Sequence, residues 1–158
     1  MIEVWRLARR PFCRTAASAF SGDGAAIAGG RWNRKGTRAV YASWTRSLAI
    51  LEILATIDRS DAPTDYVFAS ATLEESDIAR LPPLPADWRA AVRSGATVEI
   101  GQRFIAEGAA LALAVPSAIV PQELNYLINP RHRRFATLHI GKTLEPFAFD
   151  KRIFAQTR

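Results

Sequence analysis

Residues 48–55 (LAILEILA) form a long apolar run that contains one charged side chain, Glu52. A carboxylate among side chains that favour the core must meet a cationic partner or carry a large desolvation cost. A structural explanation is that Glu52 tips out of a buried helix or forms an ion pair with Arg46 or Arg59. A functional explanation is that the negative charge serves a reaction, because charged groups in unusual surroundings gather at active sites.

Two segments upstream of this run favour the functional explanation. Residues 29–33 (GGRWN) present Arg31 and Trp32 directly after two glycines, which suits a turn that exposes the Arg side chain. Residues 39–42 (AVYA) are apolar around Tyr41 and predict a short buried strand. The chain therefore places a guanidinium, two aromatic rings and a carboxylate within about two dozen residues.

The helix that carries Glu52 has clear start signals. Ser43 or Thr45 can cap its first turn, and the apolar pattern continues to about residue 57. Because apolar side chains occur nearly all round it, we expect this helix to be largely buried.

Strands and helices are mixed along the rest of the chain without a regular βαβ alternation. A loop of small residues is expected between the first strand and Arg31, and an extended proline connector at residues 81–85. This pattern predicts one α+β domain over residues 1–158, with a mainly antiparallel sheet and flanking helices. The expected strands are at residues 2–7, 38–42, 66–71, 111–115, 138–140 and 145–149, and the other expected helices are at 87–93 and 98–107.

Composition excludes several classes of protein. With 158 residues, 49% of them hydrophobic, the chain can build one compact domain. No apolar run approaches the roughly 18 residues of a membrane span, and the N-terminus lacks a secretion pattern, so we expect a cytoplasmic protein. Cys13, His132 and His139 offer no zinc spacing, and we expect no metal. Cys13 has no local base, so a nucleophilic role is not expected.

The net charge of +6 and a pI near 10.2 favour an anionic partner. The densest basic cluster, at Arg131, Arg133 and Arg134, follows Asn129-Pro130 and is better explained by a solvated turn. The chain shows no helix-turn-helix pattern, and its aromatic residues do not alternate with basic ones along a strand. A nucleic-acid-binding module is therefore a distant alternative, and we expect no direct nucleic-acid binding.

Several short motifs, taken together and in order, resemble the RES domain, the toxin component of bacterial RES-Xre type II toxin–antitoxin systems. The family is named for an Arg, a Glu and a Ser, and the matching positions are Arg31, Glu52 and Ser117. One departure is Arg34-Lys35, where many relatives have prolines. The motifs are GRWN at 30–33, the Tyr41 strand, the Glu52 helix, VPS at 115–117, NYLINP at 125–130 and FAFDKRIF at 147–154.

The resemblance implies an ADP-ribosyltransferase-like fold and an activity that degrades NAD by cleaving the nicotinamide–ribose bond. Water or phosphate would accept the ADP-ribose, making the protein a glycohydrolase or a phosphorylase with phosphate as co-substrate. An alternative is transfer of ADP-ribose to a cellular protein. The implied partner is an antitoxin with an Xre-like helix-turn-helix domain, in a hetero-oligomer.

The chemistry of the matching residues suits these roles. Cleavage of an N-glycosidic bond builds positive charge on the ribose, which the Glu52 carboxylate would stabilise in the transition state. Because the nicotinamide of NAD is already cationic, it leaves without protonation, and one carboxylate suffices. Arg31 can bind ribose hydroxyl or pyrophosphate oxygens through a bidentate fork, and can also pair with Glu52.

Other residues have weaker assignments. Tyr41 and Trp32 can stack on the nicotinamide, although aromatic residues beside a strand also commonly pack in the core. Ser117 can bond the nicotinamide amide or simply form a turn. Asn125 and Asn129 are expected to brace backbone turns near Pro130 rather than to contact substrate.

Overall fold

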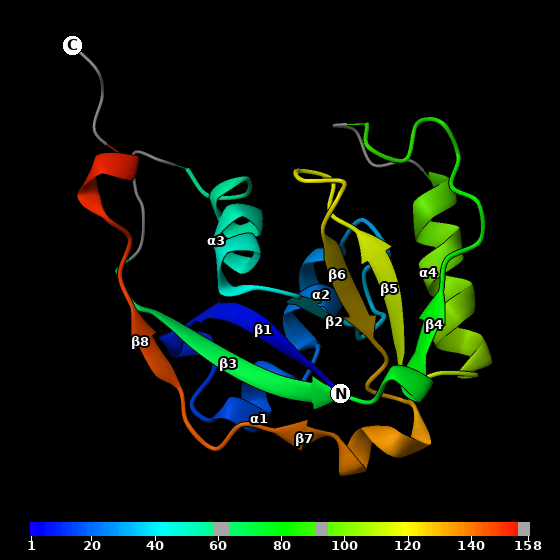
Figure 1. The fold of residues 1–158 in the computed structure, drawn as a ribbon, viewed down its shortest axis with the longest axis horizontal. Coiled ribbons are helices and arrows are strands. Elements are labelled where there is room, and N and C mark those ends of the chain that lie inside the picture. Colours follow the sequence, from blue (N-terminus) through cyan, green and yellow to red (C-terminus); the bar gives the residue numbers. More distant parts are fainter. Residues whose placement is uncertain (59–63, 91–94, 155–158) are drawn as a thin grey trace.

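The computed structural model describes residues 1–58, 64–90 and 95–154. Its main feature is a strongly curled sheet with helices on both faces (Figure 1). The strands are β1 (Ile2–Arg9), β2 (Val40–Ser43), β3 (Tyr66–Leu73), β4 (Ile78–Arg80), β5 (Ala112–Pro116), β6 (Leu124–Ile128), β7 (His139–Ile140) and β8 (Glu145–Phe147). The helices are α1 (Ala16–Ala19), α2 (Asp23–Ala28), α3 (Arg46–Leu54) and α4 (Gly95–Glu107). Short 3-10 turns lie at Arg10–Phe12, Glu75–Asp77, Arg133–Thr137 and Lys151–Ile153.

The sheet is mainly antiparallel, in the order β4-β5-β6-β2-β1-β3-β7, with β8 also paired to β3. The long pair β1 and β3 runs from Ile2 opposite Leu73 to Arg9 opposite Tyr66. Only β4 and β5 are parallel among the described strands. Because β6 pairs with both β2 and β5, it joins β2, β1 and β3 to β5 and β4.

Side chains alternate along the strands between two packed layers. On β3, Val67 and Ala69 belong to the large cluster that includes α1, whereas Tyr66 and Phe68 pack with Ala49 of α3. α3 therefore covers one face of the β1–β3 half of the sheet, as Figure 1 shows.

A third cluster fixes α4 and the loop before β2. Phe104 and Ile105 of α4 pack with Leu113 of β5, Leu127 of β6 and the indole of Trp32. Gly101 lies so close to the backbone of Trp32 that an added Cβ would collide with its carbonyl. The loop that carries Arg31 therefore packs against α4.

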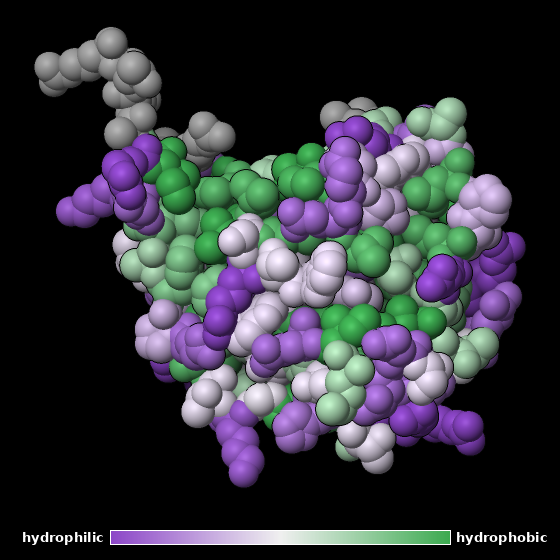
Figure 2. Space-filling view, viewed as in Figure 1, coloured by the Kyte–Doolittle hydropathy of each residue, from purple (hydrophilic) through white to green (hydrophobic). Residues whose placement is uncertain are grey.

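Most of the predicted elements are present, with two corrections to helices. α3 ends at Leu54, earlier than expected, and the prediction that it is largely buried is wrong: only Leu48 and Ala49 are buried, while Leu51 is 40% exposed. One side of the helix packs on the sheet. The molecular surface in the region of α3 is mainly hydrophobic (Figure 2). For the helix expected at 87–93, residues 87–90 form a turn, and residues 91–93 lie outside the described residues.

Sequence reasoning also missed several short elements. The small-residue segment expected to be a loop contains α1 and α2, and Thr15 and Ser18 form a reciprocal capping box at the start of α1. Strands β4 and β6 were not expected, because a charged segment precedes β4, and one turn-forming asparagine lies within β6 while another directly follows it. In the described part of the chain, no helix is both long and apolar enough to span a membrane.

Candidate functional site

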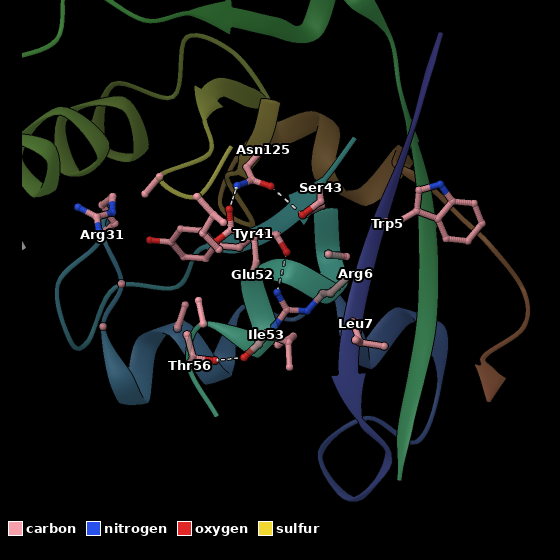
Figure 3. A pocket seen from close by; sticks show the side chains of 18 residues that line it. Trp5, Arg6, Leu7, Arg31, Tyr41, Ser43, Glu52, Ile53, Thr56 and Asn125 are labelled. Carbon is pink, nitrogen blue, oxygen red and sulfur yellow. Dashed lines mark hydrogen bonds between the residues drawn. The ribbon is translucent and has the colours of Figure 1, made fainter. Parts of the chain in front are cut away.

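A cavity of about 520 Å³ opens between α3, the loop before β2 and strands β1, β2 and β6 (Figure 3). Its volume is in the range of small-molecule sites. Three of the five predicted site residues line it: Arg31, Tyr41 and Glu52. These three residues come from neighbouring segments of the chain, and Asn125 of β6 joins them from a distant one.

The carboxylate of Glu52 is held at one of its two oxygens. Its Oε1 accepts a hydrogen bond from the Ser117 hydroxyl at 2.8 Å and one from Asn125 Nδ2 at 2.5 Å. Its Oε2 accepts no hydrogen bond from any described residue. Within the described part of the chain, the carboxylate is thus fixed by neutral donors at one oxygen, and its other oxygen can accept from a ligand.

The ion pair proposed as a structural explanation for Glu52 is not formed with Arg46. The Arg46 guanidinium instead makes two bonds to Glu145, at 2.7 and 2.9 Å, and lies 3.5 Å from the centre of the Trp5 ring. Arg59, the other suggested partner, lies outside the described residues. Glu52 therefore has an unusual position: half-buried, without a described ion-pair partner, and beside a cavity.

Ser117 lies behind the cavity wall and is fully buried. Its hydroxyl oxygen accepts hydrogen bonds from the backbone N–H groups of Ile119 and Val120, both at 3.0 Å, while its proton is donated to Glu52. The turn after β5 therefore positions this hydroxyl so that it contacts the carboxylate.

Arg31 lines the cavity from the loop before β2. Its Nη1 donates to the carbonyls of Trp88 at 2.8 Å and Ala90 at 3.1 Å, which fixes the plane of the guanidinium. Within the described residues, its Nη2 and Nε make no hydrogen bond. These groups can serve a ligand without the loss of an existing contact.

Tyr41 ties the Arg31 loop to β2. Its hydroxyl donates to Asn33 Oδ1 at 2.7 Å and accepts from the backbone N–H of Trp32 at 3.0 Å. Gly30 passes so close to the Tyr41 ring that a side chain at this position would collide with it. The ring is thus held by its polar end while it lines the cavity.

Trp32 is placed differently from the other loop residues. Its indole is 2% exposed and packs among apolar residues of α4, β5 and β6. Its buried ring anchors the loop against the core. The preceding residue, Arg31, lines the cavity instead.

Arg6 is a cavity residue that sequence reasoning missed. Its Nη1 donates to the Tyr41 carbonyl at 2.8 Å, and its buried Nε has no hydrogen-bond partner among the described residues. Burial lowers the pKa of this guanidinium, an effect opposed by Cys13 and Tyr41 nearby. A signal was present in the sequence, since Arg6 interrupts the apolar first strand, but a single Arg in a strand is usually solvated.

Asn125 lies in strand β6, so the prediction that it braces a turn is wrong. Its amide contacts Glu52, and Ser43 Oγ donates to its Oδ1 at 2.7 Å. Asn129 does brace a turn: its side chain accepts from Arg131 N at 3.0 Å and donates to the Ile105 carbonyl at 3.1 Å.

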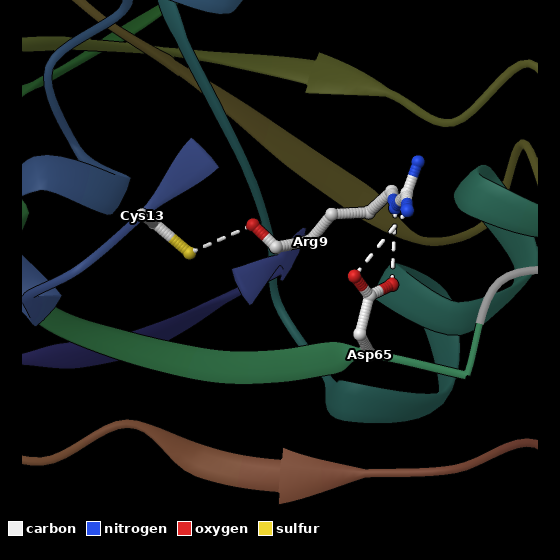
Figure 4. A network of polar contacts seen from close by, with 3 residues as sticks. All are labelled: Arg9, Cys13 and Asp65. Carbon is white, nitrogen blue, oxygen red and sulfur yellow. Dashed lines mark hydrogen bonds and ion pairs between the residues drawn. The ribbon is translucent and has the colours of Figure 1, made fainter. Parts of the chain in front are cut away.

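Cys13 is not one of the residues that line the cavity, and Figure 4 shows its contact with Arg9. The thiol is 1% exposed and donates to the Arg9 carbonyl at 3.2 Å, while the Arg9 guanidinium bonds Asp65. Burial raises the pKa of Cys13, although the positive charges of Arg6 and Arg10 act against this. A buried thiol of raised pKa is a poor nucleophile.

The basic cluster forms a turn that is partly neutralised. Arg134 pairs with the buried carboxylate of Asp77 at 2.5 Å, and His132 Nδ1 accepts from the Arg134 backbone N–H. Among the described residues, no group of three or more His, Cys, Asp or Glu side chains is placed to hold a metal ion.

A curled, mainly antiparallel sheet with flanking helices is an α+β, ADP-ribosyltransferase-like fold. The same fold is found in the crystal structure of the M. tuberculosis MbcT-MbcA toxin–antitoxin complex, with a TM-score of 0.69 over 97% of this chain and 86% of that one, at 15% identity. The predicted fold class is therefore confirmed.

The family model described as the RES domain matches residues 3–150, and the chain belongs to this family. It is 39% identical over 142 residues to the protein named Toxin Res of Yersinia enterocolitica, covering 89% of this chain and 93% of the relative. Toxin Res of Photorhabdus laumondii is 38% identical over 153 residues, with 95% and 96% coverage. The Prs ADP-ribosylating toxin of a Sphingobium strain is 35% identical over 134 residues, with 81% and 82% coverage.

Proposed function

We propose that this chain is the toxin of a toxin–antitoxin system and degrades NAD by cleaving the nicotinamide–ribose bond. The observation that carries the proposal is the state of Glu52: Oε1 is fixed by two neutral donors, and Oε2 is left for a ligand in a cavity that two guanidinium groups also line. The name Toxin Res supports the role of a toxin, and the name of the ADP-ribosylating relative supports cleavage of the same bond.

In the proposed reaction, the bond between C1′ of the ribose and the nicotinamide nitrogen breaks. Nicotinamide leaves with the electron pair and becomes neutral, while positive charge develops on the ribose. The Glu52 carboxylate stabilises that charge more strongly in the transition state than in the neutral sugar. Water then adds at C1′ and loses a proton, or phosphate adds in its place.

The arginines bind the anionic part of the substrate. NAD has a pyrophosphate with two negative charges, and the Nη2 and Nε of Arg31, which bond no other described residue, form a fork that can donate to such oxygens. Arg6 provides a second cation on the β1 side, with its Nε still without a described partner. With one positive group on each side of the cavity, the dinucleotide is held across Glu52.

The remaining predicted residues act at two distances from the substrate. The Tyr41 ring contacts the flat nicotinamide from the cavity wall. Ser117 and Trp32 act from behind the wall, Ser117 by bonding Glu52 and Trp32 by seating the Arg31 loop. This differs from direct contact with nicotinamide, which the sequence alone suggested for both residues.

Incubation of the purified chain with NAD, with and without phosphate, tests this function. We expect free nicotinamide together with ADP-ribose, or with a phosphorylated ADP-ribose when phosphate is the acceptor. Complete recovery of intact NAD under all these conditions would refute the proposal.

The second candidate is transfer of ADP-ribose to a cellular protein, which the name of the Sphingobium relative favours. The same cleavage would occur, with a protein side chain as the acceptor. Labelled NAD and a cell extract distinguish the two: label bound to a protein band supports transfer, and label found only in small molecules supports degradation.

We also propose that the partner is an antitoxin with an Xre-like helix-turn-helix domain. The charge of +6 on this chain attracts an acidic segment of a partner as readily as it attracts NAD. The structural neighbour was solved as a toxin–antitoxin complex, which supports a partner of this kind.

A further inference from the structure

Behind Glu52, three side chains form a directed hydrogen-bond relay: the Ser43 hydroxyl donates to Asn125 Oδ1, and Asn125 Nδ2 donates to Glu52 Oε1. Ser43 and Asn125 are register partners in the β2–β6 pair, so both side chains project from the same face of the sheet. Figure 3 shows the two residues side by side above Glu52. The relay links α3 to a strand 73 residues further along the chain.

The direction of each bond is fixed by the groups around it. An ionised carboxylate only accepts hydrogen bonds, so Asn125 must present its NH₂ group to Glu52 and its carbonyl oxygen to Ser43. Ser43 is 5% exposed, and its hydroxyl proton meets that carbonyl oxygen. The Ser43 hydroxyl thereby holds the amide of Asn125 in the orientation that Glu52 needs.

The second donor to Glu52 is fixed independently. The oxygen of Ser117 accepts from two backbone N–H groups, so the proton of its hydroxyl is the group left to donate to Oε1. Ser117, in the turn after β5, and Asn125, in β6, donate to the same oxygen. Both donors therefore leave Oε2 as the oxygen that faces a ligand.

We infer that Asn125, oriented by Ser43, is a positioning residue that fixes the Glu52 carboxylate and makes Oε2 the oxygen that faces the reacting ribose. The inference rests on the proposed function for the nature of the substrate, whereas the role of Asn125 in orienting Glu52 does not depend on it. Asn125 acts through Glu52, and Ser43 acts through Asn125.

The test compares single and combined variants by the kcat and KM for NAD. Asn125→Leu, which keeps the approximate side-chain volume but removes the donor, is expected to lower kcat by about 10- to 100-fold, because a displacement of about 1 Å at a reacting group costs that much. KM is expected to change less than about twofold, since the arginines that bind NAD are unaltered. Ser43→Ala is expected to give a smaller loss, most of which Ser43→Thr restores by returning the hydroxyl.

Combined variants separate positioning from a general structural role. In the Glu52→Gln background, Asn125→Leu is expected to cause no further loss of kcat, because the charge that it positions is already absent. Likewise, adding Ser43→Ala to Asn125→Leu is expected to have no further effect. Losses that multiply in either combination, or a parent-like kcat in a folded Asn125→Leu variant, would overturn the inference.

Crystal structures of the parent and of Asn125→Leu provide a readout independent of turnover. In the variant, the Glu52 side chain is expected to leave the position seen here, and a carboxylate that stays in place would overturn the inference. If the parent consumes no NAD, the proposed function fails. The relay is then still decided by whether Glu52 moves, so the two failures are distinguishable.

Discussion

Glu52→Gln is the substitution that isolates the charge of the candidate catalytic group. Glutamine keeps an Oε1 that can accept from Ser117 and Asn125, so the two hydrogen bonds that fix the side chain are retained. What changes is the group facing the cavity, where a negative oxygen is replaced by a neutral NH₂. We therefore expect the variant to fold and to bind NAD, but to turn it over slowly.

The expected loss in kcat is about 100- to 1,000-fold, or about 2.7–4 kcal/mol, the range found when one preorganised electrostatic group is removed from an active site. The melting temperature is expected to stay within about 2 °C of the parent, because Glu52 is half-buried and makes no described ion pair.

The assay is NAD consumption and nicotinamide release followed by chromatography, with circular dichroism to verify folding. Glu107→Gln is the matched control, since it makes the same change in charge at an exposed position of α4. The control should retain the parent rate. A folded Glu52→Gln protein that consumes NAD at near the parent rate would refute the role of the carboxylate.

Four further predictions concern binding, packing, reactivity and control. Arg31→Lys is expected to weaken NAD binding in calorimetry almost as much as Arg31→Ala, by about tenfold or more, because an ammonium cannot replace the fork; full affinity in the Lys variant would exclude it. Gly101→Ala is expected to lower the free energy of unfolding by about 1–3 kcal/mol, because its Cβ collides with the Trp32 carbonyl, whereas Gly95→Ala, with open space around it, should leave the melting curve in place. Cys13 is expected to react with a thiol reagent at pH 8 at least about tenfold more slowly in the folded chain than in urea, since burial raises its pKa and disfavours the thiolate; equal rates would contradict the buried position. A saturating amount of antitoxin is expected to abolish NAD binding, and unchanged affinity in the complex would require control at a distance from the cavity.

Local signals in the sequence were sufficient for most of the elements that build the cavity. The Thr45 cap marks the start of α3, and its side chain accepts from Leu48 N as a capping residue should. The glycines before Arg31 predicted a loop that presents this side chain, which the structure bears out. In both cases the determining interaction lies within a few residues, so one sequence contains it.

The remainder depends on contacts between distant residues, which local patterns do not encode. Asn125 carries the signature of a turn residue, and only the pairing of β6 with β2 brings it to Glu52. The burial of Trp32 depends in the same way on a glycine of α4 at position 101. The burial of α3 was overestimated because a helix with apolar residues on all sides has the pattern of a core helix. In this structure, the apolar residues on one side of α3 face the cavity and the solvent.

The insertion of β6 between β2 and β5 also sets the order of events during synthesis. A chain leaves the ribosome from its N-terminus, so β1, β2, α3 and β3 emerge and can begin to pair long before β6. Both donors to Glu52 belong to the last third of the chain, and closing contacts across 65 and 73 residues is a late step in folding. A nascent or truncated toxin that ends before β6 therefore carries Arg31 and Glu52 without the two donors that order the carboxylate, and the complete site can form only after β6 has been synthesised.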